Sequence, residues 1–85
     1  MFKPLVKIHL WSGLRALAGG EEIVEVRASN IGQMLDALLK AHPGLKDAVE
    51  AGVSVSVNGR IYAHGLTQEV DEESEIYLLQ RIKGG

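Results

Sequence analysis

Two stretches near the N-terminus alternate between apolar and polar positions, which predicts β-strands with one buried face. In residues 5–11 the two kinds of side chain take opposite faces, the first set being Val6, Ile8 and Leu10 and the second Lys7, His9 and Trp11. Residues 21–28 alternate in the same way, so we expect a second strand antiparallel to the first. The connection between them holds at most one helical turn, and we expect its Leu14 and Leu17 to pack under the sheet.

A helix is predicted between Asn30 and Pro43. Its apolar residues recur at spacings of three and four and therefore share one face, namely Ile31, Met34, Leu35, Leu38 and Leu39. Asn30 is a favourable N-cap residue, and Gln33 stands where a capping-box side chain reaches back. Pro43 ends the helix because it lacks an N–H donor and restricts the residue before it. Residues 45–51 predict a short helix or turn that ends at Gly52 and covers one end of the core.

The C-terminal half contains the remaining strands. Residues 53–57 alternate strictly, and the Asn58-Gly59 pair predicts a type I′ hairpin turn, in which both residues take positive φ. Residues 60–62 then form a brief returning strand. After an acidic turn, residues 75–82 are apolar on both faces, which is typical of a central strand.

This order of elements predicts an α+β fold, the ubiquitin-like β-grasp, with a mixed sheet of four to five strands and one main helix packed across one face. We expect the domain to comprise residues 1–82 and a flexible C-terminal tail to comprise residues 83–85. A folded domain seldom ends on residues such as Gly84 and Gly85, which cost backbone entropy to order and contribute no side chain. They provide instead a thin arm with an unhindered carboxylate, suited to a channel in which any Cβ would collide.

Composition excludes several functional classes. The 85 residues suffice for one domain, and a net charge of −2 argues against a nucleic-acid-binding role. The absence of cysteine rules out disulfides, thiol catalysis and cysteine-ligated metals. His9, His42 and His64 lack metal-ligand spacing, so we predict no metal site. No apolar run is long enough for a membrane span or a secretory signal, and we therefore expect a cytoplasmic protein without a membrane partner.

Several segments together carry a family resemblance. They are residues 6–11, residues 14–19, the helix with Leu35 and Leu38, residues 55–59, residues 66–70, the acidic turn and the final Gly84-Gly85 pair. On these the chain resembles the MoaD/ThiS group of ubiquitin-like (β-grasp) sulfur carriers, and its MoaD-like branch more closely. The final pair is specific to mechanism, whereas the other segments match the fold. MoaD-type tails commonly carry prolines before the glycines, whereas residues 79–83 contain none.

The resemblance implies a protein co-substrate with no active site of its own, which could be counted as the small subunit of a molybdopterin-synthase-like enzyme. A partner adenylyltransferase of the ubiquitin-activating type, using ATP and magnesium, converts the Gly85 carboxylate to an acyl-adenylate. A persulfide or sulfide then displaces the nucleotide and leaves a thiocarboxylate. A sulfur-acceptor enzyme, such as a molybdopterin synthase large subunit, takes the sulfur for molybdopterin, with thiamin or another sulfur pathway as the next alternative. No cofactor bound to this chain is implied.

The resemblance also implies a partner-binding patch. Trp11, Ile61 and Leu79 align with large apolar residues that face partners in the family, and Arg15 matches a family arginine that could pair with a partner carboxylate. Independently, Trp11 lies in the outward register of its strand, and an outward tryptophan is a common interface anchor. The alternatives are that the apolar side chains pack under the connecting loops and that Arg15 is a solvated surface charge.

Two other functions remain open. The first is a ubiquitin-like protein modifier, joined through Gly85 to lysines of target proteins, since the basic tail with Arg81 and Lys83 is a feature of other ubiquitin-like proteins. In either case we expect these two charges to steer the arm toward an acidic channel mouth. The second is a non-catalytic β-grasp adaptor that binds partners by its sheet alone.

Overall fold

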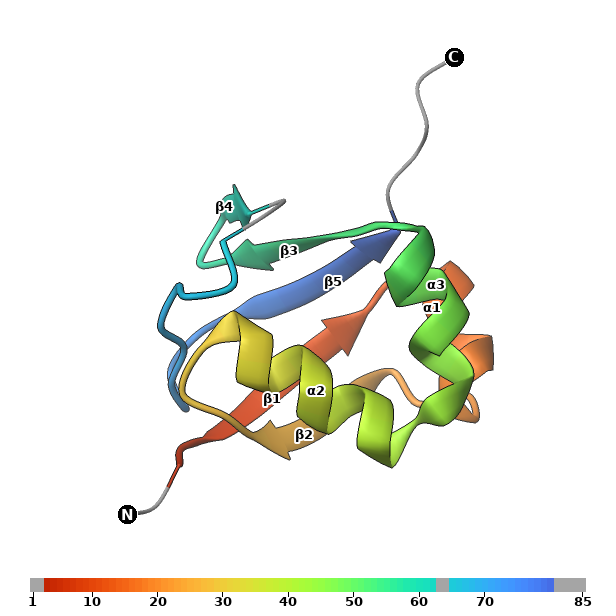
Figure 1. The fold of residues 1–85 in the computed structure, drawn as a ribbon, viewed down its shortest axis with the longest axis horizontal. Coiled ribbons are helices and arrows are strands. Elements are labelled where there is room, and N and C mark those ends of the chain that lie inside the picture. The colour runs from red at the N-terminus through yellow and green to blue at the C-terminus, as the bar shows by residue number, and fades with distance from the viewer. Residues whose placement is uncertain (1–2, 63–64, 81–85) are drawn as a thin grey trace.

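The computed structural model describes residues 3–62 and 65–80, which form a five-stranded mixed sheet with α2 packed across one face (Figure 1). The strand order is β2-β1-β5-β3-β4, so the last strand lies at the centre beside the first. The strands are β1 (Leu5–Leu10), β2 (Ile23–Arg27), β3 (Val53–Val57), β4 (Arg60–Tyr62) and β5 (Ile76–Gln80). The helices are α1 (Ser12–Arg15), α2 (Ile31–Ala41) and α3 (Lys46–Ala51), with 3₁₀ turns at Ala16–Ala18 and Pro43–Leu45.

β1 lies between β2 and β5 in the sheet. It pairs antiparallel with β2, with Ile8 opposite Val24, and parallel with β5, with Ile8 opposite Ile76. β3 pairs antiparallel with both β5 and β4. Because parallel pairing needs a crossover connection, the chain between β1 and β5 must pass over the sheet, and α2 lies on this path. The predicted α+β fold, a mixed sheet of four to five strands with one main helix across one face, is confirmed, and the sheet has five strands.

The core lies between α2 and the face of the sheet that α2 covers, which we call the inner face. The strands contribute Val6, Ile8, Leu10, Val24, Val26, Val53, Val55, Val57, Ile76 and Leu78, and α2 contributes Ile31, Met34 and Leu38. No polar or charged side chain is buried in residues 3–62 and 65–80. The alternation in the sequence selects these residues because successive side chains of a strand point to opposite faces. Burial of each large aliphatic side chain stabilises the fold by roughly 1.5–3 kcal/mol.

The N-terminus of α2 is capped as the sequence predicts. Asn30 Oδ1 accepts a hydrogen bond from the Gln33 backbone N–H at 2.8 Å. Gln33 Oε1 reaches back and accepts from the Ser29 N–H at 2.9 Å, one residue before the donor that a capping box uses. The helix ends at Ala41, ahead of Pro43. The Asn30 cap at one end and Pro43 beyond the other therefore fix where the crossover helix starts and stops.

The connection between β1 and β2 differs from the prediction. It holds two successive turns, α1 and the 3₁₀ turn at Ala16–Ala18, where at most one was expected. Leu14 is fully buried as expected, but the expectation for Leu17 is wrong, because this side chain is 44% exposed. Ala18 is buried in its place, since residues four apart lie on the same side of a helical segment.

The hairpin after β3 has the predicted geometry. Asn58 has φ 52° and Gly59 has φ 85°, and a type I′ turn requires both angles to be positive. Residues 81–82 of the predicted final strand lie outside the described residues, as do His64 and the tail of residues 83–85, so the domain boundary stays a prediction. Within residues 3–62 and 65–80, no helix combines the length and apolar character needed to cross a membrane.

Candidate partner-binding face

The face of the sheet opposite α2 carries a row of mostly apolar side chains, and we call it the outer face. Each strand contributes one residue to the row, which runs Ile23, His9, Tyr77, Ser56 and Ile61 from β2 to β4. Ile61 is 62% exposed, and Ile23 and Tyr77 are also exposed. Large apolar side chains gathered on an exposed surface mark a site of interaction with another molecule.

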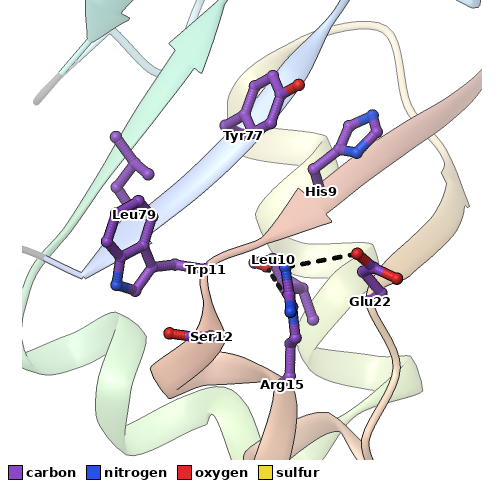
Figure 2. Close-up of a pocket in the computed structure, with 8 residues that line it drawn as sticks. All are labelled: His9, Leu10, Trp11, Ser12, Arg15, Glu22, Tyr77 and Leu79. Atoms are coloured by element: carbon purple, nitrogen blue, oxygen red, sulfur yellow. Dashed lines mark hydrogen bonds and ion pairs between the residues drawn. The ribbon is translucent and has the colours of Figure 1, made fainter.

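A hollow of about 450 Å³ lies at the end of the outer face where β1 and β5 end (Figure 2). Its lining consists of His9, Leu10, Trp11, Ser12, Arg15, Glu22, Tyr77 and Leu79. Leu10 pairs with Leu78 in the parallel register, so Trp11 and Leu79 are the next residues along the two chain segments. The Trp11 side chain is 56% exposed, whereas Leu79 is half-buried. The hollow therefore has an exposed aromatic side chain beside a half-buried leucine.

Arg15 lies at the rim of this hollow and is engaged within the chain. Its Nε donates a hydrogen bond to the Leu10 carbonyl oxygen at 3.0 Å. Its Nη2 lies 3.6 Å from Glu22 Oε1, and both side chains are substantially exposed. Figure 2 shows the guanidinium between these two partners. The Glu22 contact is an exposed ion pair and contributes at most about 1 kcal/mol, so the bond to Leu10 is the stronger of the two.

His9 and Tyr77 form a stacked pair at the middle of the row. Their ring centroids are 4.7 Å apart with an interplanar angle of 21°. The Tyr77 hydroxyl donates to Glu75 Oε1 at 3.1 Å. That hydrogen bond, followed by the negative charge of Glu75, raises the pKa of Tyr77 above its ordinary value, because both favour the protonated phenol. The Tyr77 hydroxyl is therefore a neutral donor held at the surface.

The structure brings most of the predicted partner-binding residues onto one surface. Trp11, Arg15 and Leu79 line the hollow, and Ile61 lies on the same face, two strands from β5. The alternative in which the apolar residues pack under loops is wrong for Trp11 and Ile61, since both are more than half exposed.

The remaining predicted site residues cannot be placed. Lys83, Gly84 and Gly85, with Arg81, lie outside the described residues. Within the part of the chain that is described, no cluster of three or more histidine, cysteine, aspartate or glutamate side chains is arranged to bind a metal ion.

Three residues of the outer face were missed by the sequence reasoning: Ile23, His9 and Tyr77. The strands of His9 and Ile23 alternate, so the side of each was visible in the sequence, whereas residues 75–82 are apolar on both faces and did not assign Tyr77 to either. The signal for grouping them was absent, because only the pairing of β1 with β2 and β5 brings them together.

The comparisons with known proteins agree with this fold. Residues 8–85 match the ThiS family. This chain belongs to the ThiS family. The match confirms the resemblance to the MoaD/ThiS group and extends over both terminal glycines. No curated protein matches this ThiS-family chain significantly.

Several solved structures are similar to this ThiS-family chain over nearly its whole length. SAMP1 from Haloferax volcanii is 27% identical with a TM-score of 0.78, and the alignment covers 95% of this chain and 99% of that one. A chain of the BexX/CysO complex from Amycolatopsis orientalis is 25% identical with a TM-score of 0.76, covering 94% and 99%. The putative molybdopterin converting factor subunit 1 from Pyrococcus furiosus is 19% identical with a TM-score of 0.78, covering 94% and 100%, and supports the fold alone.

Proposed function

We propose that this ThiS-family protein is a sulfur carrier. Its Gly85 carboxylate is adenylated by a partner enzyme and converted to a thiocarboxylate, which donates sulfur in cofactor biosynthesis. The observation that carries the proposal is the family match, because it includes Gly84 and Gly85 as well as the folded domain. Molybdopterin synthesis is the first candidate pathway, and thiamin or another sulfur-requiring pathway is the next.

The chemistry follows from the state of the tail carboxylate. A C-terminal carboxyl group is ionised at neutral pH and is therefore a poor acyl electrophile. One carboxylate oxygen attacks the α-phosphorus of ATP in the partner's active site, and pyrophosphate leaves. Hydrosulfide then attacks the carbonyl carbon, AMP leaves, and Gly85 retains a thiocarboxylate. Magnesium and the cationic groups that this displacement needs are supplied by the adenylyltransferase, while this chain binds the partner and presents the tail.

β5 connects the outer face to the tail. It contributes Tyr77 and Leu79 to that face and ends at Gln80, five residues before Gly85. An extended chain spans at most about 3.3–3.6 Å per residue, so five residues reach at most roughly 18 Å from the end of β5. A partner seated on the outer face therefore needs its active site within that radius.

The outer face supports docking to the two proposed partners in turn, the adenylyltransferase and the sulfur acceptor. It exposes Trp11 and Tyr77, and tryptophan and tyrosine are enriched among interface hot spots. The similar chain of the BexX/CysO complex belongs to a two-protein assembly. We propose that Trp11, Leu79 and Ile61 supply the contact area on this chain, with the hollow receiving a side chain of the partner.

Intact-mass spectrometry tests the carrier chemistry. The protein is incubated with ATP, magnesium, a sulfide source and the adenylyltransferase from the same genome. The expected product has the mass gain of one oxygen exchanged for one sulfur, and the gain is absent when ATP is omitted. A variant without Gly85 is the matched control, and it should stay unmodified. Unchanged mass of the wild-type chain under all conditions would refute the proposal.

Protein modification is the second candidate function. It is favoured by the similarity to SAMP1, a small archaeal modifier protein, at 27% identity. Both functions begin with adenylation of Gly85 and differ in the group that attacks the acyl-adenylate, a sulfur nucleophile or a lysine amine. Peptide mapping of the same reactions separates them, because isopeptide-linked glycyl remnants on lysines of other proteins indicate modification. A chain that supports its pathway without Gly85 would instead indicate the adaptor function.

A further inference from the structure

The backbone of Trp11 is fixed on both sides while its side chain stays exposed. Its N–H donates to the Leu78 carbonyl oxygen at 3.1 Å, and its own carbonyl accepts from the N–H groups of Leu14 and Arg15 at 2.8 and 3.2 Å. It is the N-cap residue of α1, with extended φ −62° and ψ 152°. The position of the indole therefore depends on how the end of β1 is held against the start of α1.

Arg15 holds these two segments together. Its backbone N–H bonds to the Trp11 carbonyl, and its Nε bonds to the carbonyl of the preceding residue, Leu10. Its Nη2 faces Glu22, whose own carbonyl accepts from the Leu10 N–H at 2.9 Å. One side chain thus connects the end of β1, the first turn of α1 and the start of β2 around Trp11.

We propose that Arg15 is a positioning residue that sets the orientation of Trp11 for partner docking, an inference that rests on the proposed docking function of the outer face. The competing role is a direct ion pair between Arg15 and a partner carboxylate. A carboxylate binds an arginine best through two parallel N–H donors. Here the Nε donor is occupied by Leu10, and the adjacent Nη2 faces Glu22. The side of the guanidinium formed by these two donors is turned toward the chain itself.

The fluorescence of the free protein tests the positioning directly, because Trp11 is the single tryptophan of the chain. Arg15→Met keeps an apolar stem of similar length and removes both side-chain contacts. We expect lower fluorescence anisotropy and stronger quenching by acrylamide than in the wild type. Arg27→Met is the matched control, since Arg27 Nη1 donates to the Lys3 carbonyl at 3.0 Å at the far end of the sheet. Wild-type fluorescence in Arg15→Met would overturn the proposal.

Activation kinetics with the adenylyltransferase from the same genome test the consequence for docking. Loss of one charge-assisted hydrogen bond predicts that Arg15→Met raises KM for this protein about tenfold, with kcat unchanged. Because Arg15 acts through Trp11, the double variant with Trp11→Ala should bind no more weakly than Trp11→Ala alone. Additive losses would indicate direct contact with the partner and overturn the proposal.

Glu22→Gln separates the two roles even if Arg15→Met fails to fold. A positioning role predicts unchanged or weaker docking, because a partner of Arg15 is lost. A direct role predicts tighter docking, because the guanidinium is released for the partner. If the adenylyltransferase activates none of the variants or the wild type, the proposed carrier function fails, while the fluorescence of the free variants still decides whether Arg15 positions Trp11.

Discussion

Replacing Trp11 with alanine removes the largest exposed aromatic group of the outer face. Its exposed fraction is 56%, and a tryptophan side chain presents up to about 250 Å², so docking can bury about 140 Å² of it. At about 25 cal/mol per Å², the gain is at most about 3.5 kcal/mol. Immobilising the side chain costs about 0.5–1.5 kcal/mol. We therefore expect Trp11→Ala to lose about 2 kcal/mol, or roughly 30-fold in affinity.

Adenylyltransferase-dependent exchange of pyrophosphate into ATP measures this loss. If Trp11 contributes to binding equally in the ground state and the transition state, KM for the protein rises and kcat stays the same. Leu17→Ala is the matched control, because it also truncates an exposed apolar side chain to alanine. Leu17 is 44% exposed, but it belongs to the 3₁₀ turn and does not line the hollow. Urea unfolding of both variants establishes that the comparison is made on folded protein.

Any of three results would refute the reasoning. One is a KM for Trp11→Ala within about twofold of the wild-type value, since the exposed area would then contribute nothing to docking. Another is an equal increase for Leu17→Ala, which would show that any exposed apolar side chain has the same effect. A fall in kcat alone would also contradict a docking role, because it would place Trp11 in the chemical step.

Three further predictions concern stability and ionisation. Asn58→Ala should lower the free energy of unfolding by about 2 kcal/mol, because Asn58 tolerates φ 52° and its Oδ1 accepts from the Glu75 N–H at 2.8 Å. Asn58→Gly should lower the free energy of unfolding in urea by about half as much as Asn58→Ala, because glycine adopts positive φ readily. Equal losses in the two variants would show that the positive φ does not contribute. Gly44→Ala should destabilise the fold by about 1–3 kcal/mol in thermal unfolding, since a Cβ there would lie 2.6 Å from the Leu17 carbonyl oxygen. Glu75→Ala should lower the pKa of Tyr77 toward its ordinary value in a phenolate absorbance titration, with Tyr77→Phe assigning the signal. Since the pKa of Tyr77 is raised in the folded state, its contribution to stability is present below the ordinary tyrosine pKa. That contribution is lost as the pH rises through the pKa of the folded state, and this loss of stability at alkaline pH should be smaller in Glu75→Ala.

The elements of the fold could be predicted because each has a local cause. Alternation in residues 5–11 and 53–57 separates the inner from the outer side chains without knowledge of the pairing. Asn30 begins α2 by accepting a hydrogen bond from the Gln33 N–H three residues later, and Pro43 ends it because proline lacks an N–H donor. Leu17 was misassigned because its exposure depends on a change from α-helical to 3₁₀ geometry within a few residues, which apolar spacing does not encode.

The site could be predicted only in part, since its contacts are non-local. The outward register of Trp11 was readable from its own strand. The hollow could not be predicted, because it forms only where the parallel pairing of β1 and β5 places Leu10 beside Leu78. The contacts of Arg15 could not be predicted either, and from the sequence this residue could be a partner contact or a solvated charge. Its Glu22 partner lies just before β2, which folds back beside β1 after two turns.

The central strand explains how one small sheet can serve both stability and docking. In β5, Ile76 and Leu78 are fully buried on the inner face, while Tyr77 and Leu79 lie on the outer face. A shift of one residue in the pairing with β1 would exchange these two sets, and the apolar core therefore fixes the outer face as well. Substitutions at outer-face positions leave the inner contacts intact, so partner preference can change without loss of the fold. Because β5 ends at Gln80, the register that packs the core also fixes where the last described strand ends beside the docking face.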